Sequence, residues 1–179
     1  MNLKNLVLAF SVLVLFSCKN ETANDSSNSV KEEDGPSFKV TANVIVKKDD
    51  DFCLLFTEDG SINFKDKAVW KKVVGNEKEQ LVEFWLPKDA YPSQLRLDFG
   101  INSEQEEIIV KSIKMEYGKN VRELKGNEIS AFFRADDSKC TYDSTTGIIK
   151  PLTKDGKKQN CSLYPHESIQ AVEIPKLAK

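Results

Sequence analysis

From residue 37 to the C-terminus, the chain is a succession of short apolar runs separated by Gly, Pro, Asn and Asp. In the clearest run, Phe38, Val40, Ala42, Val44 and Val46 alternate with mostly polar neighbours. A period of two is typical of a β-strand that turns one face to a core. Apolar residues at helical spacing are scarce, so the pattern predicts an all-β domain.

We expect about ten strands, each bounded by turn signals such as Asp59-Gly60, Gly75-Asn76 and Gly118. They cover residues 38–46, 52–57, 68–74, 80–86, 95–99, 108–117, 129–134, 140–145, 148–150 and 169–174. A short helix is expected only over residues 120–125, which could equally form a turn.

Half-apolar strands must bury their apolar face against a second layer. Their uneven lengths and irregular loops favour a two-sheet antiparallel β-sandwich of the jelly-roll type. A small β-barrel, which needs paired strands of even length around a cavity, is the alternative. The chain of 179 residues can build one ordinary core, so we expect a single folded domain over residues 37–179.

Residues 1–17 have the features of a signal peptide. Lys4 precedes an unbroken apolar run, residues 6–16, which is too short to span a bilayer as a permanent helix. The run ends in Leu15-Phe16-Ser17-Cys18, which resembles the lipobox of bacterial lipoproteins. The resemblance implies cleavage before Cys18, lipidation of Cys18 and anchoring to a membrane. An ordinary secretory signal peptide with an incidental cysteine is the alternative.

Residues 18–36 are almost devoid of apolar side chains and are predicted to form a disordered tether. A flexible chain of this length reaches on the order of 25 Å. Lys19 follows the cysteine, where some Gram-negative families carry an aspartate that retains lipoproteins in the inner membrane. The resemblance therefore favours the outer membrane, with the periplasmic or cell-surface face left open.

Charge and motifs exclude several function classes. With 26 basic and 28 acidic side chains, the chain lacks the positive field that nucleic acid requires. His166 is the single histidine, and no glycine-rich phosphate-binding motif or G-x-S-x-G motif is present. We therefore expect no cofactor, no metal site and no catalytic triad, with His166 in a surface loop.

Acidic residues suggest no reactive site either. Asp49, Asp50 and Asp51 could offer oxygens to Ca²⁺, but three consecutive acids on one loop cannot all face one ion, so a solvated turn is favoured. Glu83 and Asp98 could be an acid pair of a glycosidase by count alone, but both alternate with apolar strand residues. We expect them to face solvent and the protein not to be an enzyme.

Three cysteines remain once Cys18 is lipidated, an odd number in an oxidising compartment. Cys53 lies in an apolar run and is expected to be buried and free. Cys140 and Cys161 flank a polar, hairpin-like segment, and we predict a disulfide between them. Closing a loop of about twenty residues would stabilise the fold by roughly 3 kcal/mol. Two free thiols are the alternative.

Four segments follow one another in an order that resembles a known family: 51–57 with Glu58-Asp59-Gly60, then 80–84, 95–100 and 108–117. The order is similar to that of the galactose-binding-like jelly-roll modules, a type of carbohydrate-binding module that accompanies bacterial surface polysaccharide proteins and carbohydrate-active enzymes. The resemblance covers about residues 38–164. It implies that the domain binds glycans.

Aromatic rings are the residues to examine for such binding, because sugar C–H faces stack on Trp and Tyr. Tyr91, Tyr142 and Tyr164 fall in expected loops and are the predicted ligand contacts. Trp85, between Phe84 and Leu86, is expected in the core, and Trp70 is left undecided.

The sequence thus predicts a membrane-anchored lipoprotein with a non-enzymatic, carbohydrate-binding β-sandwich. The alternative is a structural envelope lipoprotein that has no glycan ligand and docks a partner protein through a sheet edge or an apolar patch. The oligomeric state is left open.

Overall fold

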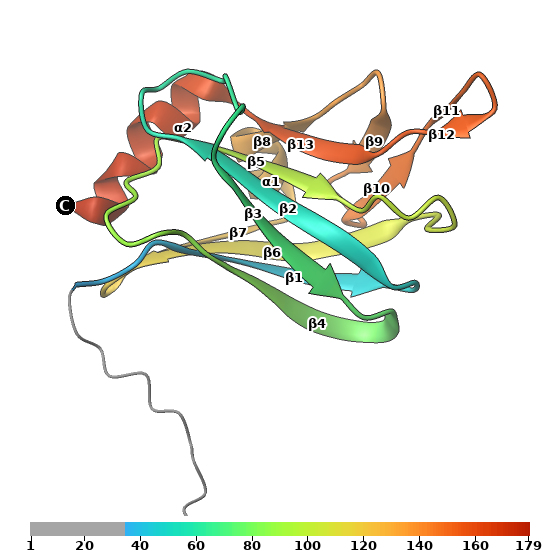
Figure 1. Ribbon diagram of the computed structural model, residues 1–179, viewed down its shortest axis with the longest axis horizontal. Helices are drawn as coiled ribbons and strands as arrows, with labels where there is room; N and C mark the ends of the chain where they lie inside the picture. The colour runs from blue at the N-terminus through green and yellow to red at the C-terminus, as the bar shows by residue number, and fades with distance from the viewer. Residues whose placement is uncertain (1–34) are drawn as a thin grey trace, which may run out of the picture. The chain divides into compact units, whose positions relative to one another are not determined.

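The computed structural model describes residues 35–179, which form two antiparallel β-sheets packed face to face (Figure 1). The expected β-sandwich is confirmed, and the barrel alternative is wrong because each sheet has two free edges. The predicted signal peptide, the lipidation site Cys18 and nearly all of the predicted tether lie outside the described residues. Within residues 35–179, no helix has the length and apolar character needed to cross a bilayer.

One sheet, called the β1 sheet, has the strand order β4-β1-β6-β10-β9, and β7 also pairs with β6. Its strands are β1 (Lys39–Val46), β4 (Asn76–Trp85), β6 (Ile108–Tyr117), β7 (Asn120–Lys125), β9 (Cys140–Asp143) and β10 (Ile148–Pro151). Two strands share the far edge of β6, because β10 pairs with its first two residues and β7 with its last six.

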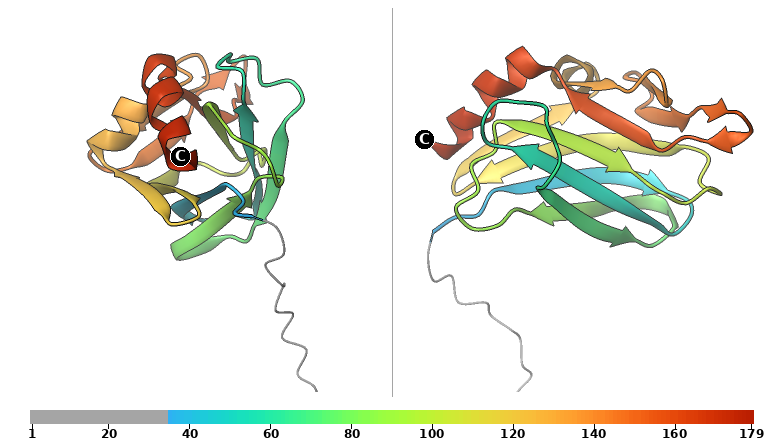
Figure 2. Two further views of the ribbon diagram at one scale, coloured as in Figure 1. Left: turned by 90° about the vertical axis from the view of Figure 1, so that its left-hand side faces the viewer. Right: turned by 45° about the horizontal axis from the view of Figure 1, so that its top comes forward.

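The other sheet, called the β2 sheet, has the order β3-β2-β5-β13-β8. Its strands are β2 (Asp50–Thr57), β3 (Ala68–Val73), β5 (Gln94–Phe99), β8 (Phe133–Ala135) and β13 (Cys161–Pro165). A small hairpin, β11 (Thr153–Lys154) and β12 (Lys157–Lys158), projects at one end of the sandwich, and α2 (Glu167–Glu173) and the 3₁₀ helix Pro175–Ala178 lie at the other (Figures 1 and 2).

The core lies between the inner faces of the two sheets. Every apolar residue of the alternating run from Phe38 to Val46 that was expected to face inward is fully buried. They meet Phe52, Leu54 and Phe99 from the opposite sheet in one continuous cluster. Since each buried Val, Leu or Phe side chain contributes roughly 1.5–3 kcal/mol, this layer is the main source of stability.

Two segments predicted as strands are helical. Residues 129–134 begin in helix α1 (Asn127–Phe132), where Ile129 and Phe132 are buried three residues apart, and only then enter β8. Residues 169–174 lie mostly in α2, which buries Gln170 and the following Ile174 four residues apart. Both spacings fit one face of a helix, a periodicity that is hard to recognise over six residues.

Residues 120–125, predicted as a short helix or turn, form the strand β7. The chain reverses at Gly118-Lys119, and β7 pairs with β6 from Tyr117↔Asn120 to Ser112↔Lys125. This register points Leu124 into the core beside Ile113, where both are fully buried. Pairing with a long neighbouring strand thus decides the structure of a segment whose own pattern is ambiguous.

A buried glutamine connects α2 to the sheets. The Gln170 side-chain carbonyl accepts the Leu95 backbone N–H at 2.7 Å, and its amide nitrogen donates to the Phe132 carbonyl at 3.0 Å. The first bond satisfies a backbone N–H of β5, and the second adds to the bond that the Phe132 carbonyl already accepts from the His166 N–H. Helix α2 therefore closes one end of the sandwich.

The side chains of the three consecutive aspartates form hydrogen bonds or ion pairs with different parts of the chain. Asp49 accepts the Gly75 N–H at 2.7 Å, and Asp51 forms an ion pair with Lys72 at 3.4 Å. Asp50 is buried, and one of its oxygens accepts the backbone N–H groups of Ile101 and Asn102 at 2.7 and 2.9 Å. The expected solvated turn is therefore wrong for Asp50, which organises the β5–β6 loop.

Replacing Gly100 with alanine should lower the free energy of unfolding by at least about 2 kcal/mol. Gly100 has a φ of 77°, and an added Cβ would overlap the buried Asp50 carboxylate. Gly60 is the matched control, because its φ is 79° but no atom lies within 4 Å of the added Cβ. Alanine there should cost about 1 kcal/mol. Equal losses in urea denaturation would contradict the role of Asp50.

Candidate ligand-binding face

The most distinctive surface of the molecule is the outer face of the β2 sheet. The strand registers place outward side chains of different strands side by side in two cross-strand rows. The first row contains Trp70, Cys53, Asp98, Ser162 and, just beyond the end of β8, Asp136. The second row contains Ala68, Leu55, Arg96, Tyr164 and Arg134.

Tyr164 lies between two arginines in the second row. The guanidinium carbons of Arg96 and Arg134 lie 4.4 and 5.4 Å from the centre of its ring, and they come from the strands on either side of β13. The β2–β3 loop brings Phe64 edge-on to the same ring, at 6.4 Å. Cations over an aromatic face are attracted by its quadrupole. Because these groups surround the Tyr164 ring, little room is left for a sugar to stack on it.

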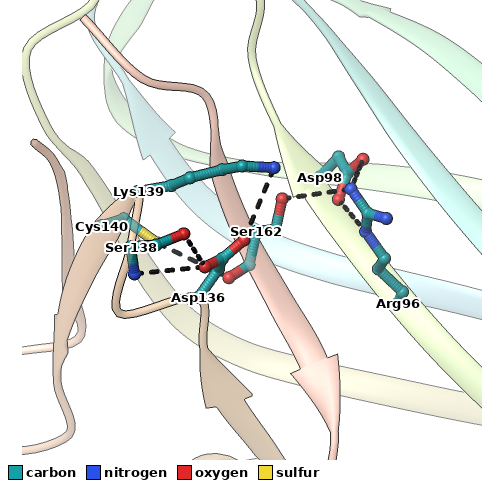
Figure 3. Close-up of polar contacts among 7 residues, drawn as sticks. All are labelled: Arg96, Asp98, Asp136, Ser138, Lys139, Cys140 and Ser162. Carbon is teal, nitrogen blue, oxygen red and sulfur yellow. Dashed lines mark hydrogen bonds and ion pairs between the residues drawn. The ribbon is translucent and has the colours of Figure 1, made fainter. Parts of the chain in front are cut away.

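A charge pair joins the two rows (Figure 3). Arg96 donates from two nitrogens to both oxygens of Asp98, at 2.7 and 2.8 Å, and lies 3.5 Å from the Ser162 hydroxyl. A bidentate guanidinium–carboxylate pair of this kind has a fixed orientation. The prediction that Asp98 faces outward is confirmed.

Asp136 is held by the turn that follows β8 (Figure 3). Its carboxylate accepts the Ser138 hydroxyl at 2.6 Å and lies 3.5 Å from the Lys139 ammonium. Partial burial opposes ionisation, but the bonds from Ser138 and the charge of Lys139 outweigh it and lower the pKa of Asp136. Asp136 is therefore a carboxylate at neutral pH.

Arg134 differs from the other charged groups of this face. No ion pair or hydrogen bond joins its guanidinium to any side chain within residues 35–179, and its contact is the Tyr164 ring. Arg96 is balanced by Asp98, and Lys139 by Asp136. The face therefore carries one uncompensated positive charge, at Arg134.

Trp70 provides an open aromatic surface at the β3 end of the first row, with 57% of its surface exposed. Trp85, predicted for the core, is 51% exposed on the outer face of the β1 sheet, where the Lys39 ammonium lies 5.0 Å from its ring. The prediction for Trp85 is wrong because its neighbour Phe84 faces inward, and alternation turns Trp85 outward.

The structure does not bring the three predicted tyrosine contacts together. Tyr91 is exposed in the β4–β5 loop, where its ring lies 5.8 Å from that of Tyr117 at the end of β6. Tyr142 pairs with Ile149 near the beginning of β6, roughly 30 Å away along that strand. Tyr164 lies on the other sheet.

Tyr142 and Tyr164 were expected in exposed loops, but both lie in strands and are half-buried. Tyr142 packs against the core, and burial raises the pKa of its hydroxyl to about 12. Tyr91 is the most exposed of the three, but it does not line the shallow depression of about 330 Å³ between the β2–β3 and β4–β5 loops, which ends at the preceding residue, Ala90. There Glu58 is already bonded to Lys67 and to the Tyr91 N–H, which lowers its pKa.

The acid pair considered from the sequence is not assembled. Glu83 lies on the outer face of the β1 sheet, 3.6 Å from Lys39, whereas Asp98 lies on the outer face of the β2 sheet. The two carboxylates therefore point away from each other across a sandwich about 10 Å thick between its sheets. Within residues 35–179, no group of three His, Cys, Asp or Glu side chains is arranged to hold a metal.

The predicted disulfide is wrong, because Cys140 and Cys161 are both free and buried. Cys140 begins β9 in one sheet and Cys161 begins β13 in the other, so the fold brings the two thiols near each other without a covalent bond. The Cys140 thiol donates to the Ser162 carbonyl at 3.5 Å. A hydrogen bond from Cys161 lowers the pKa of Cys140 to about 7.

Cys53 is buried and free, as expected, but it lies outside the core cluster, on the outer face between Trp70 and Asp98. Burial raises the pKa of its thiol to about 11.

Sequence reasoning did not identify Arg96 and Arg134 as candidate functional residues. Only three of the 26 basic residues are arginines, Arg96, Arg122 and Arg134, and this rarity was the signal that could have directed attention to them.

Alkylation in denaturant without a reductant should label Cys53, Cys140 and Cys161, because none is bonded to another. In the native protein the same reagent should label none of the three within the same time, because all are buried. Peptide mass spectrometry measures both states. Recovery of a linked Cys140–Cys161 peptide pair would contradict the prediction.

Comparison with known proteins finds no matching family model, no matching curated protein and no matching solved structure. The resemblance to galactose-binding-like modules therefore stays a prediction, and the functional argument depends on the geometry of the β2-sheet face.

Proposed function

We propose that this chain is a membrane-anchored lipoprotein whose β-sandwich is a non-enzymatic module that binds carbohydrate across the outer face of the β2 sheet. One observation carries the proposal: the exposed Trp70 ring lies in the same cross-strand row as the partly exposed carboxylates of Asp98 and Asp136. Five strands spaced by about 4.8 Å give this row a length of roughly 19 Å, which suits an extended ligand.

The chemistry of the row suits sugars. An indole face packs against the C–H groups of a pyranose ring, and carboxylates accept hydrogen bonds from sugar hydroxyls. Asp98 is oriented by Arg96, and Asp136 by Ser138 and Lys139, so both acceptors are held in place before a ligand arrives. Such preorganisation reduces the entropic cost of binding.

The protonation of this face favours binding over catalysis. A general acid for glycoside cleavage needs a carboxyl whose pKa is raised towards neutral. The pKa of Asp136 is lowered instead, and Asp98 is paired with Arg96 in bidentate geometry. Both carboxylates are therefore suited to accept hydrogen bonds rather than to deliver a proton.

The membrane location rests on the lipobox resemblance of residues 15–18. In a Gram-negative host, the full chain should fractionate with the outer membrane and carry acyl chains on Cys18. The Cys18→Ser variant should leave the membrane fraction. Fractionation and intact-protein mass spectrometry test this, and a processed chain with an unmodified Cys18 would refute the anchor.

Trp70→Ala should weaken glycan binding at least about tenfold, since an aromatic stacking surface is lost. Trp85→Ala is the matched control, because Trp85 is similarly exposed but lies on the opposite sheet. A glycan array with the full chain in mild detergent identifies ligands, and calorimetry measures the affinities. Equal loss in both variants would place the ligand elsewhere.

A second candidate, docking of an envelope protein, is favoured by the exposed apolar residues of β3, β4 and the turn that joins these strands of different sheets. Trp70, Val74, Leu81 and Trp85 are all more than half exposed, and β3 and β4 are both edge strands. If glycans do not bind, and Leu81→Ser or Trp85→Ala releases a protein captured from solubilised outer membrane, this candidate replaces the first.

A further inference from the structure

Arg134 has the features of a recognition group rather than a structural one. It lies on β8 at the edge of the β2 sheet, is exposed, and carries the one positive charge of the two rows that has no ion-pair partner within residues 35–179. It is also one of only three arginines in the chain, whose other basic residues are lysines. A guanidinium offers a planar fork of donors to an acid group, whereas lysine offers a point charge.

We infer that the β2-sheet face recognises a glycan bearing singly charged acidic groups, carboxylates or sulfate esters, and that Arg134 binds one such group. This inference rests on the proposed function, because it names the class of carbohydrate that the same face takes. Arg134 supplies the charge, and Tyr164 holds its guanidinium in position.

The charges of the face favour a ligand group with a single negative charge over a dianionic group. Arg96 and Lys139 are each neutralised by an aspartate of the same face, at 2.7 and 3.5 Å. A dianionic phosphate would find one free cation and two carboxylates, Asp98 and Asp136, nearby. A singly charged group balances Arg134 alone and avoids that repulsion.

The guanidinium is oriented before the ligand binds. The Arg134 guanidinium carbon lies 5.4 Å from the centre of the Tyr164 ring, a cation–π contact that restricts the arginine, and Arg96 contacts the ring from the other neighbouring strand. Fixing a long side chain in advance removes part of the entropic cost of forming a charged hydrogen bond. Arg134 therefore differs from lysines scattered over the surface.

The rest of the face favours a sugar polymer over an acidic peptide. Trp70 lies at the far end of the neighbouring row from Arg134, with the partly exposed carboxylate of Asp98 between them. This carboxylate and that of Asp136 can accept hydrogen bonds from the hydroxyls that every sugar unit carries. A peptide with successive acidic side chains would place some of them against Asp98 and Asp136, whereas a glycan with one acidic group at Arg134 places neutral hydroxyls there.

The test uses the full chain in mild detergent and an array that carries each uronic-acid glycan beside its methyl ester and each sulfated glycan beside its desulfated form. We expect the acidic member of a pair to bind at least about tenfold more tightly than its neutral partner. The two kinds of pair distinguish carboxylate from sulfate as the recognised group. Raising the salt concentration should reduce the preference, because exposed charges are screened.

Arg134→Ala should abolish the preference for the acidic member while leaving the neutral member's affinity unchanged. Arg134→Lys should retain only a small part of this preference, because lysine keeps the positive charge but lacks the planar set of donors and the guanidinium contact with Tyr164. Arg122→Ala is the matched control, since Arg122 lies on β7 in the other sheet and pairs with Glu128. It should change neither affinity. Trp70→Ala should weaken both members equally.

The failures of the two proposals are distinguishable. If both members of each pair bind equally, the inference about Arg134 is overturned and the carbohydrate function stands. If no glycan binds to protein whose circular dichroism shows a folded β-sandwich, both are overturned. If polyglutamate binds as tightly as the best acidic glycan and Arg134→Ala removes that binding, the ligand is an acidic peptide and the glycan inference is wrong.

Discussion

Burial of one apolar face on each of two sheets is the constraint on which the rest of this structure depends. Successive side chains of a strand point to opposite faces, so placing Leu97 and Phe99 in the core necessarily turns Arg96 and Asp98 outward. The same rule applied to β13 turns Tyr164, which is half-buried, and Ser162, which is buried, towards the outer face. The candidate ligand-binding face is therefore the direct counterpart of the core.

The outer face acquires its chemistry from strands that are distant in the sequence. Arg96 and Arg134 are 38 positions apart, and they flank Tyr164 only because β13 lies between β5 and β8. Gln170 connects α2 to β5 at Leu95 and to the end of α1 at Phe132. Because these residues lie one and two positions from Arg96 and Arg134, the buried glutamine helps to hold the two strands that carry the arginines.

The prediction of local structure succeeded for the long strands and for several short ones, and it failed only in short segments. The eight-residue strand β1 and the ten-residue strand β6 were recognised because each repeats its alternation of apolar and polar residues several times. Helices α1 and α2 and strand β7 have six or seven residues each, too few to distinguish a period of two from a period of 3.6. For β7, pairing with β6 decided the outcome, which no local pattern could show.

The sequence by itself determined the fold class and the outward direction of Asp98, because both follow from alternation along a single strand. It also contained, in the rarity of arginine, a signal of where charge is used for a specific contact. Only the tertiary structure decided which side chains meet: it separated Tyr91, Tyr142 and Tyr164, left Cys140 and Cys161 unbonded, and placed Arg134 beside Tyr164. The physical reason is that these relationships depend on strand order and register across the two sheets, which arise from the packing of the whole core and are not encoded in the spacing of any one segment.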